Sequence, residues 1–179
     1  MKLLRTIRAD ASDTFVFERA AEPGEWAVSG AFAFARADPE ALERKARGAF
    51  RSGFLGVGSL GWSTLAEIVE ASEEDRLQAI DILAAQLLAH FGAPDLATAR
   101  LAAVEEIAFA ASLCNHPTGT LVAVSRSFED GSIREVFRAL GPDAGSGPTR
   151  VFDAIEVVGD EEAEAPAIEP PSPAKGDRP

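Results

Sequence analysis

The sequence is poor in the side chains that usually carry enzyme chemistry. It has two histidines, one cysteine, no tyrosine and three lysines among 179 residues. Acids, bases and nucleophiles that work near neutral pH come mostly from these residue types and from paired carboxylates. A catalytic role is therefore the weaker hypothesis, and we predict neither a cofactor nor a metal site.

The single cysteine, Cys114, cannot form an internal disulfide. The first residues, Met1–Arg5, lead into mixed polar sequence instead of the apolar core of a signal peptide. No apolar run approaches the roughly 20 residues that a membrane-spanning helix needs. We therefore expect a cytoplasmic protein in a reducing compartment, without contact with a membrane.

Positive charge is also scarce. The chain has 17 lysine and arginine residues against 29 acidic ones, which gives a formal net charge of -12. Nucleic acids and anionic membranes attract basic surfaces, so neither is an expected partner. Hydrophobic residues make up 46% of the chain, enough for the core of a soluble globular protein. Another protein is the partner that we expect, and the oligomeric state stays open.

Local patterns predict mixed secondary structure. Strands are predicted over residues 3–8, 14–18, 26–34 and 64–71. In the second of these, Phe15 and Phe17 alternate with their neighbours and share one face. In the third, Gly30 either continues the strand or marks a bulge. Helices are predicted from Asp38, as the N-cap, to Gly53, and from a capping box at Ser72–Asp75 to Gly92. A third, alanine-rich helix is predicted over Pro94–Cys114.

Asp130-Gly131 is a strong turn signal for a β-hairpin. A two-residue loop pairs Phe128 with Ile133, Arg126 with Glu135, and Val124 with Phe137. This register is self-consistent, because aromatic residues face aliphatic ones and opposite charges face each other. This register predicts that Phe128, Ile133, Val124 and Phe137 share one face of the sheet, covered by helices.

Strand pairs at both ends of the chain, with helices between them, predict an α+β fold. We expect one domain over residues 1–158, with a mainly antiparallel sheet and about three helices against one face. Residues 140–150 are interpreted as a linker or loop, and 151–158 as a candidate for one more strand. The proline-rich, acidic residues 159–179 are predicted to form a disordered tail.

Residues 56–61 read Gly-Val-Gly-Ser-Leu-Gly and match the G-x-G-x-x-G pattern of dinucleotide-binding loops. That mechanism needs a strand before the glycines and a helix that begins within them, whereas here a helix precedes and a strand follows. A structural connection is thus favoured over nucleotide binding. Trp62, directly after the loop, either closes the core, which is favoured, or lines a ligand pocket.

Cys114 and His116 lie two residues apart at the predicted end of the third helix. The partial negative charge of a helix C-terminus opposes a thiolate, so a buried structural thiol is favoured over a Cys–His nucleophile. A metal site would need further ligands, and His90 is the only other histidine.

Charged residues provide the remaining candidates. Of the adjacent Glu105 and Glu106, one is expected to face solvent. The other either pairs with an arginine of the hairpin (Arg126, Arg134 or Arg138) or stands in a cleft as a functional carboxylate. Arg134 and Arg138 share a strand face, where they either hold a carboxylate or phosphate or are simply solvated.

Four segments resemble a small family of bacterial proteins of unknown function: Thr14–Ala20, Phe50–Gly56, Gly61–Thr64 and Phe109–Cys114. The resemblance covers roughly residues 1–140. It implies a single compact bacterial domain and brings no activity and no catalytic residue to this chain.

The favoured interpretation is a non-catalytic accessory or protein-interaction domain. The alternative is a small-ligand-binding protein or enzyme with a pocket near Gly56–Trp62 and Cys114–His116. No catalytic residue is assigned. The candidate ligand-binding residues are Trp62, Glu106, Cys114, His116, Arg134 and Arg138.

Overall fold

The computed structural model describes residues 1–8 and 12–141. In chain order the elements are β1 (Lys2–Thr6), α1 (Ser12–Val16), β2 (Trp26–Val28), the short 3-10 helix η1 (Ala31–Phe34), α2 (Arg44–Ser52), β3 (Phe54–Gly56), β4 (Trp62–Ser63), β5 (Leu65–Glu70), α3 (Glu73–His90), α4 (Leu96–Ser112), β6 (Leu121–Glu129) and β7 (Ser132–Leu140). None of these helices in the described part of the chain is long and apolar enough to cross a membrane.

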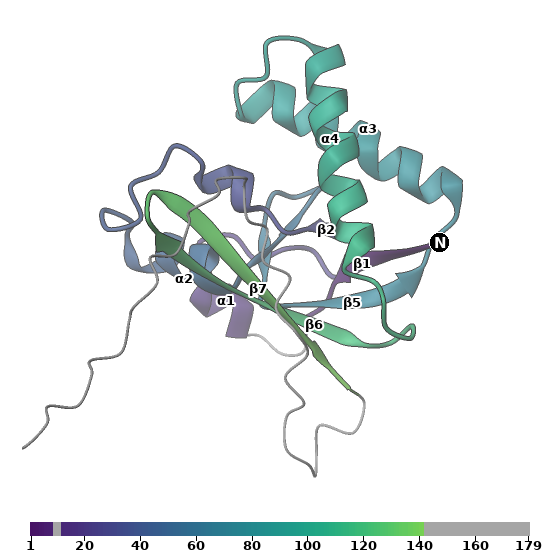
Figure 1. Ribbon diagram of the computed structural model, residues 1–179, viewed down its shortest axis with the longest axis horizontal. Coiled ribbons are helices and arrows are strands. Elements are labelled where there is room, and N and C mark those ends of the chain that lie inside the picture. The colour runs from purple at the N-terminus through teal and green to yellow at the C-terminus, as the bar shows by residue number, and fades with distance from the viewer. Residues whose placement is uncertain (9–11, 142–179) are drawn as a thin grey trace, which may run out of the picture.

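The strands form one antiparallel sheet in the order β4-β3-β2-β1-β5-β6-β7 (Figure 1). The first strand of the chain is therefore the middle strand of the sheet. Strand β4, which carries Trp62, lies at one edge, and β7, which carries Arg134 and Arg138, lies at the other. The predicted α+β class with a mainly antiparallel sheet is confirmed.

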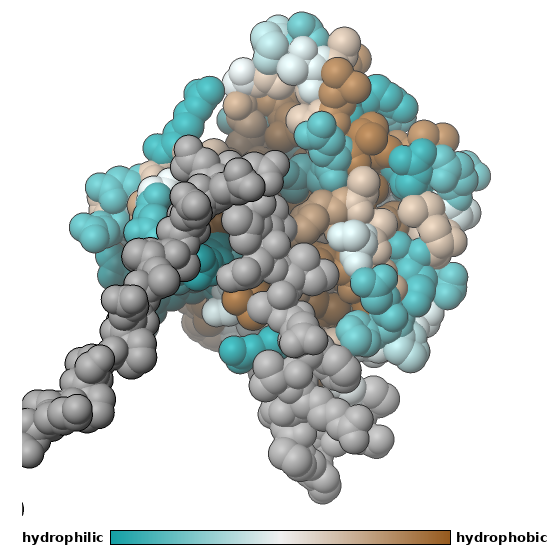
Figure 2. Space-filling view, in the orientation of Figure 1, coloured by the Kyte–Doolittle hydropathy of each residue, from teal (hydrophilic) through white to brown (hydrophobic). Residues whose placement is uncertain are grey.

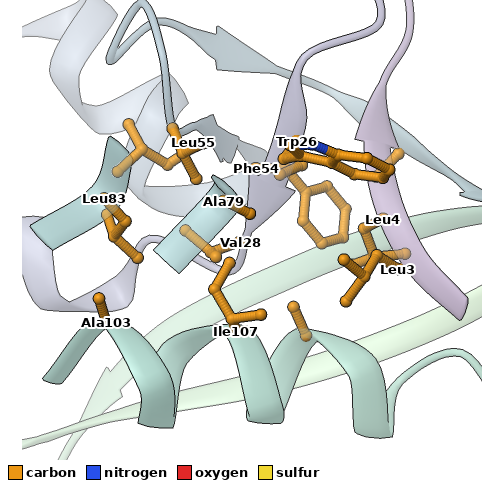
Figure 3. Packing of buried hydrophobic residues seen from close by; sticks show 14 of the residues in the cluster. Leu3, Leu4, Trp26, Val28, Phe54, Leu55, Ala79, Leu83, Ala103 and Ile107 are labelled. Atoms are coloured by element: carbon orange, nitrogen blue, oxygen red, sulfur yellow. The ribbon is translucent and has the colours of Figure 1, made fainter. Parts of the chain in front are cut away.

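Helices α3 and α4 pack on each other, and α4 also contacts β1 and β2. Small residues on α4, Ala99, Ala103 and Ala110, are fully buried, so the helix backbone approaches its neighbours closely. Between them Ile107 points toward Val28, inside the main core (Figure 3). Alanine enrichment of the third predicted helix is thus explained by close packing.

A second apolar cluster joins the residue that follows α1 to η1 and α2. It consists of Phe17, Phe34, Ala49 and Phe50. Trp62 packs against both this cluster and the main core. The tryptophan therefore lies where the two apolar regions of the molecule meet.

Several local predictions are confirmed. The hairpin register is the predicted one, with Phe128 opposite Ile133 and Val124 opposite Phe137. The capping box at Ser72 is formed, because its hydroxyl accepts the Asp75 N–H and the Asp75 carboxylate accepts the Ser72 N–H. On the predicted core face Val124 is buried, whereas Phe128, near the hairpin tip, stays 46% exposed.

The strand predicted over residues 14–18 is wrong, because Ser12–Val16 forms the short helix α1. Phe15 and Phe17 were expected on one face of that strand, but Phe15 is exposed and Phe17 is fully buried. The Asp13 carboxylate accepts a hydrogen bond from the Thr64 hydroxyl at 2.6 Å and thereby ties α1 to a residue far along the chain. A five-residue pattern cannot reveal such a contact.

The strand predicted from Trp26 to Phe34 ends at Val28. Gly30 takes a left-handed φ of 82°, and η1 follows. A Cβ atom at Gly30 would lie 2.6 Å from Cβ of Leu55, so only glycine lets the chain turn this close to β3.

The next helix starts later than predicted, at Arg44 with Glu43 as its N-cap. Asp38 instead accepts the Glu40 N–H in a local turn. The predicted strand at 151–158 and the predicted tail at 159–179 lie outside the described residues.

Candidate ligand-binding site

A cavity of about 570 Å³ lies beside Trp62. Its walls come from distant parts of the chain: the segment after α1, η1, α2, the β3–β4 hairpin and the residue after α3. The lining residues are Glu18, Arg19, Ala33, Phe34, Lys45, Ala46, Ala49, Leu55, Leu60, Trp62 and Phe91. Most of the lining residues are apolar, but Leu55, Ala49 and Phe34 are almost fully buried, so the surface of the cavity is mixed polar and apolar.

The indole of Trp62 is closely packed by its neighbours. Its ring lies 5.2 Å from that of Phe34, and its backbone N–H donates to the carbonyl of Arg19 at 2.9 Å. A Cβ atom at Gly53 would lie 2.7 Å from Cε3 of Trp62, and one at Gly30 would lie 2.9 Å from Cζ3. The two glycines therefore provide flat backbone surfaces against which the indole packs, and the aromatic wall is preformed.

The glycine-rich loop beside Trp62 binds a carboxylate of the chain itself. Glu25 accepts hydrogen bonds from the N–H groups of Gly58 and Ser59, both at 2.8 Å, and from the Ser59 hydroxyl. A Cβ atom at Gly56 would lie 2.3 Å from a Glu25 carboxylate oxygen, so the glycine is needed for this approach. The loop connects β3 to β4 and begins no helix. The G-x-G-x-x-G pattern is thus explained by Glu25, without a nucleotide.

Leu60, within the same loop, has a φ of 56°. This left-handed conformation is unfavourable for a leucine and is found mainly where surrounding structure enforces it. Its N–H donates to the carbonyl of Gly56 at 3.0 Å, and its side chain lines the cavity. The loop therefore places an apolar side chain against the cavity at the expense of backbone strain.

Three charged residues complete the lining: Glu18, Arg19 and Lys45. All three are exposed, so they lie where the cavity meets solvent. Arg19 also donates to the carbonyl of Ser59 at 3.0 Å, which fixes its position against the loop. With two cations and one acid, the opening is locally positive in a chain whose net charge is -12.

Cys114 and His116, named as candidates from the sequence, do not line this cavity. Cys114 is buried in the main core, its thiol donates to the carbonyl of Ala110 at 3.4 Å, and burial raises the pKa of the thiol to about 11. The backbone carbonyl of His116 accepts a hydrogen bond from Nζ of Lys2 at 2.6 Å. Both observations describe a packed helix end rather than an activated nucleophile.

Glu106 lies in a different cluster, with Arg126 and Glu135. The pKa of Glu106 is raised to about 7, mainly by burial and in addition by the Glu135 and Glu105 carboxylates, while Arg126 opposes the shift. The pairing with Arg126 was one of the alternatives left open by the sequence. This cluster links α4 to the hairpin at a place separate from the cavity lining.

Arg126 is the central residue of this cluster, and its predicted pairing with Glu135 across the hairpin is confirmed. Its side chain is fully buried and bonds Glu135 at 2.6 Å. It also donates to the carbonyls of Phe50 and Gly53, at 3.0 and 2.8 Å, and to that of Ser29. Burial lowers the pKa of Arg126, while Glu135 acts in the opposite direction. The sequence predicted its partner Glu135 but not its full burial or its bonds to the carbonyls of Ser29, Phe50 and Gly53.

Arg134 and Arg138 lie on the outer face of the hairpin, and both are exposed. Arg134 forms an ion pair with Glu129 at 2.7 Å. Of the six candidates, the structure thus places Trp62 in the cavity, Glu106 in the Arg126 cluster, and the remaining four at other sites. Within residues 1–8 and 12–141, no group of three or more His, Cys, Asp or Glu residues could hold a metal ion.

The fold and the cavity define an α+β protein with a preformed aromatic pocket. The chain belongs to the family described as a family of unknown function (DUF6505), whose model matches residues 1–150. No curated protein matches the chain. No solved structure matches it either.

Proposed function

We propose that this is a non-catalytic accessory protein that binds a small amphipathic carboxylate in the cavity at Trp62. The observation that carries the proposal is the lining itself, an aromatic and aliphatic wall next to Arg19 and Lys45. The wall suits an apolar or aromatic body, and the two cations suit one anionic group.

The charge of the opening supports a carboxylate rather than a neutral or cationic ligand. A protein with a net charge of -12 repels anions at long range, so local cations are needed to hold one. Arg19 and Lys45 are the positive groups in the lining, and Glu18 is the single negative one. Because these groups are exposed, they contribute selectivity more than affinity.

The lining also favours binding over catalysis. Among the described residues that line the cavity there is neither a histidine nor a cysteine, and the aromatic wall offers no proton donor matched to neutral pH. The buried Cys114 thiol, with its raised pKa, is elsewhere in the core.

The test compares three probes of the same shape and different charge: 3-phenylpropionate, 3-phenylpropanol and 3-phenylpropylammonium. Isothermal titration calorimetry on the full chain measures each affinity. We expect the carboxylate to bind most tightly, the alcohol less tightly and the ammonium least. Equal affinities for the three probes, or no binding of the carboxylate, would contradict the proposal.

A pair of neighbouring charge reversals locates the site. Lys45→Glu should weaken 3-phenylpropionate binding by about tenfold, because it makes the opening negative. Arg44→Glu is the matched control, since Arg44 is exposed on the same helix and does not line the cavity. An equal loss in both variants would show a general charge effect and exclude this cavity as the site.

A further inference from the structure

Helix α4 has two apolar stripes, and only one of them faces the core. The core stripe is Ala99, Ala103, Ile107 and Ala110, all buried. The other stripe is Ala97, Leu101, Val104 and Ala108, all exposed, with Leu101 at 68% and Val104 at 37%. At 100° per residue, the outer stripe occupies an arc of about 60°, centred about 130° around the helix from the core stripe.

This outer stripe can be reached by another molecule. Figure 1 shows that the α3–α4 turn projects beyond the sheet, with α4 in front. In the same view, hydrophobic atoms gather over the region of α4 (Figure 2). Leu101 and Val104 lie three residues apart, so their side chains are neighbours and form a continuous apolar strip on this face of α4.

The spacing of the outer stripe is that of a coiled-coil seam. Its members follow one another at intervals of four, three and four residues, which is the alternation of a and d positions in a heptad. In this assignment Leu101 and Ala108 are a positions, and Ala97 and Val104 are d positions. The core stripe cannot serve as such a seam, because the sheet and α3 already cover it.

Two flanking charges select the partner and its orientation. Arg100 occupies a g position and Glu105 the following e position, the pair that forms salt bridges between parallel helices. A second, parallel copy of α4 would therefore make Arg100–Glu105 contacts on both sides of the seam. An antiparallel copy would instead set like charges on the same flank. In the single chain Arg100 pairs with Asp81 of α3, and both side chains are about half exposed, so the guanidinium lies at the surface beside the seam.

We infer that the outer stripe of α4 is a homodimer interface, in which two copies of the chain associate through parallel α4 helices. The occupant is a second copy because the stripe supplies both halves of the charge complementarity itself. One leucine and one valine per chain form a small seam, so the dimer is weak and depends on concentration. This interface is separate from the cavity at Trp62, and neither proposal depends on the other.

Sedimentation velocity of the full chain, from about 1 μM to about 1 mM, tests for the dimer. We expect a concentration-dependent shift from monomer to dimer, lost in Leu101→Asp. Leu77→Asp is the matched control, because Leu77 is a 40% exposed leucine on α3, outside the stripe. Circular dichroism confirms that each variant is folded. A monomer across the whole range, or a dimer that survives Leu101→Asp, would overturn the inference.

Reversing the charges of Arg100 and Glu105 tests the parallel orientation, because it predicts a recovery of dimer formation as well as its loss. Arg100→Glu and Glu105→Arg should each weaken self-association at least tenfold, because each sets like charges across the interface. Mixing the two variants should restore the dimer, since each position then meets its opposite charge. Failure of the mixture to associate would overturn the parallel register, as would association of either single variant at wild-type strength.

Discussion

At the scale of single residues, the glycines around β3 and the β3–β4 loop each make room for a particular side chain. Gly56 gives room to the Glu25 carboxylate, and Gly53 and Gly30 give room to the indole of Trp62. A pattern that resembles a phosphate-binding loop is therefore produced by close contacts within one chain. The anion that this loop binds is a side chain placed 33 residues before Gly58.

Gly61 gives the sharpest test of these contacts. A Cβ atom there would lie 2.4 Å from the carbonyl oxygen of Ala20, and backbone cannot move aside as a side chain can. Gly61→Ala should lower the free energy of unfolding by roughly 3 kcal/mol, measured from urea denaturation midpoints. The control is Gly131→Ala, where φ is +80° but no atom lies within 4 Å, so only backbone strain of about 1 kcal/mol applies. Equal losses of unfolding free energy in the two variants would mean that the backbone around Gly61 shifts to relieve the contact with Ala20.

At the scale of elements, the β6–β7 hairpin is specified by its own sequence. The Asp130-Gly131 turn fixes the register, and Asp130 takes the left-handed φ of 51° that such a turn requires. With that register, Phe137 falls on the core face and its ring lies 5.7 Å from that of Phe109 on α4 and 6.2 Å from that of Phe54. The hairpin is thereby fastened to both a helix and the opposite half of the sheet.

Phe137→Ala should therefore destabilise the protein by roughly 2–4 kcal/mol, a loss of aromatic contacts at a half-buried site. Ser132→Ala, at the exposed start of β7, should change the stability by no more than about 0.5 kcal/mol. Guanidinium denaturation of both variants measures the difference. Two equally small effects would show that the hairpin is not packed as described.

At the scale of the whole molecule, Arg126 joins elements that are far apart in the sequence. From β6 it reaches the last carbonyls of α2, the carbonyl of Ser29 after β2, and Glu135 on β7. A buried cation at the C-terminal end of a helix is also favoured by the helix dipole. The network orders the side of the molecule on which α2 helps to form the cavity.

Arg126→Met should cost roughly 3–5 kcal/mol, because it removes the cation beside the largely buried Glu135 carboxylate and the donor to several buried carbonyls. Arg134→Met removes an exposed ion pair from the same hairpin and should cost at most about 1 kcal/mol. Thermal unfolding followed by circular dichroism measures both. Similar midpoints for the two variants would contradict a central role for Arg126.

Glu106 gives the molecule a dependence on pH. Its pKa of about 7 in the folded state lies above the ordinary value of 4.5, so the folded chain holds a proton that the unfolded chain releases between these pH values. The contribution of Glu106 to the free energy of unfolding is fully present below about pH 4.5 and is lost as the pH rises through about 7. The charged groups that act on it are Glu135, Glu105 and Arg126.

Glu106→Gln should remove this loss and raise the stability at pH 8 by on the order of 2 kcal/mol, with a flatter profile between pH 5 and 8. Urea midpoints across that range provide the measurement. Glu105→Gln is the control, since Glu105 is exposed and should leave most of the slope in place. An unchanged slope in Glu106→Gln would assign the pH dependence to another group.

Much of the candidate site could not be predicted from the sequence. The position of Trp62 after a glycine-rich loop predicts either a core residue or a pocket wall, and the structure shows both, because Trp62 packs on the two apolar clusters and lines the cavity. Phe34 and Phe91 could not be added to it, because the contacts that bring η1 and the end of α3 to β4 are not local. Cys114 and His116 were grouped with Trp62 by their chemistry, and the sheet places them elsewhere.

The sequence by itself determined the elements whose signals are local: the capping box at Ser72, the alanine-rich α4 and the register around Asp130-Gly131. In each case the hydrogen bonds join residues close in the chain or fixed by one turn. Only the tertiary structure decided that residues 12–16 form a helix, that Gly30 turns the chain and that Arg126 is buried. Those outcomes depend on Thr64, Leu55 and the end of α2, which reach their places only when the sheet has formed.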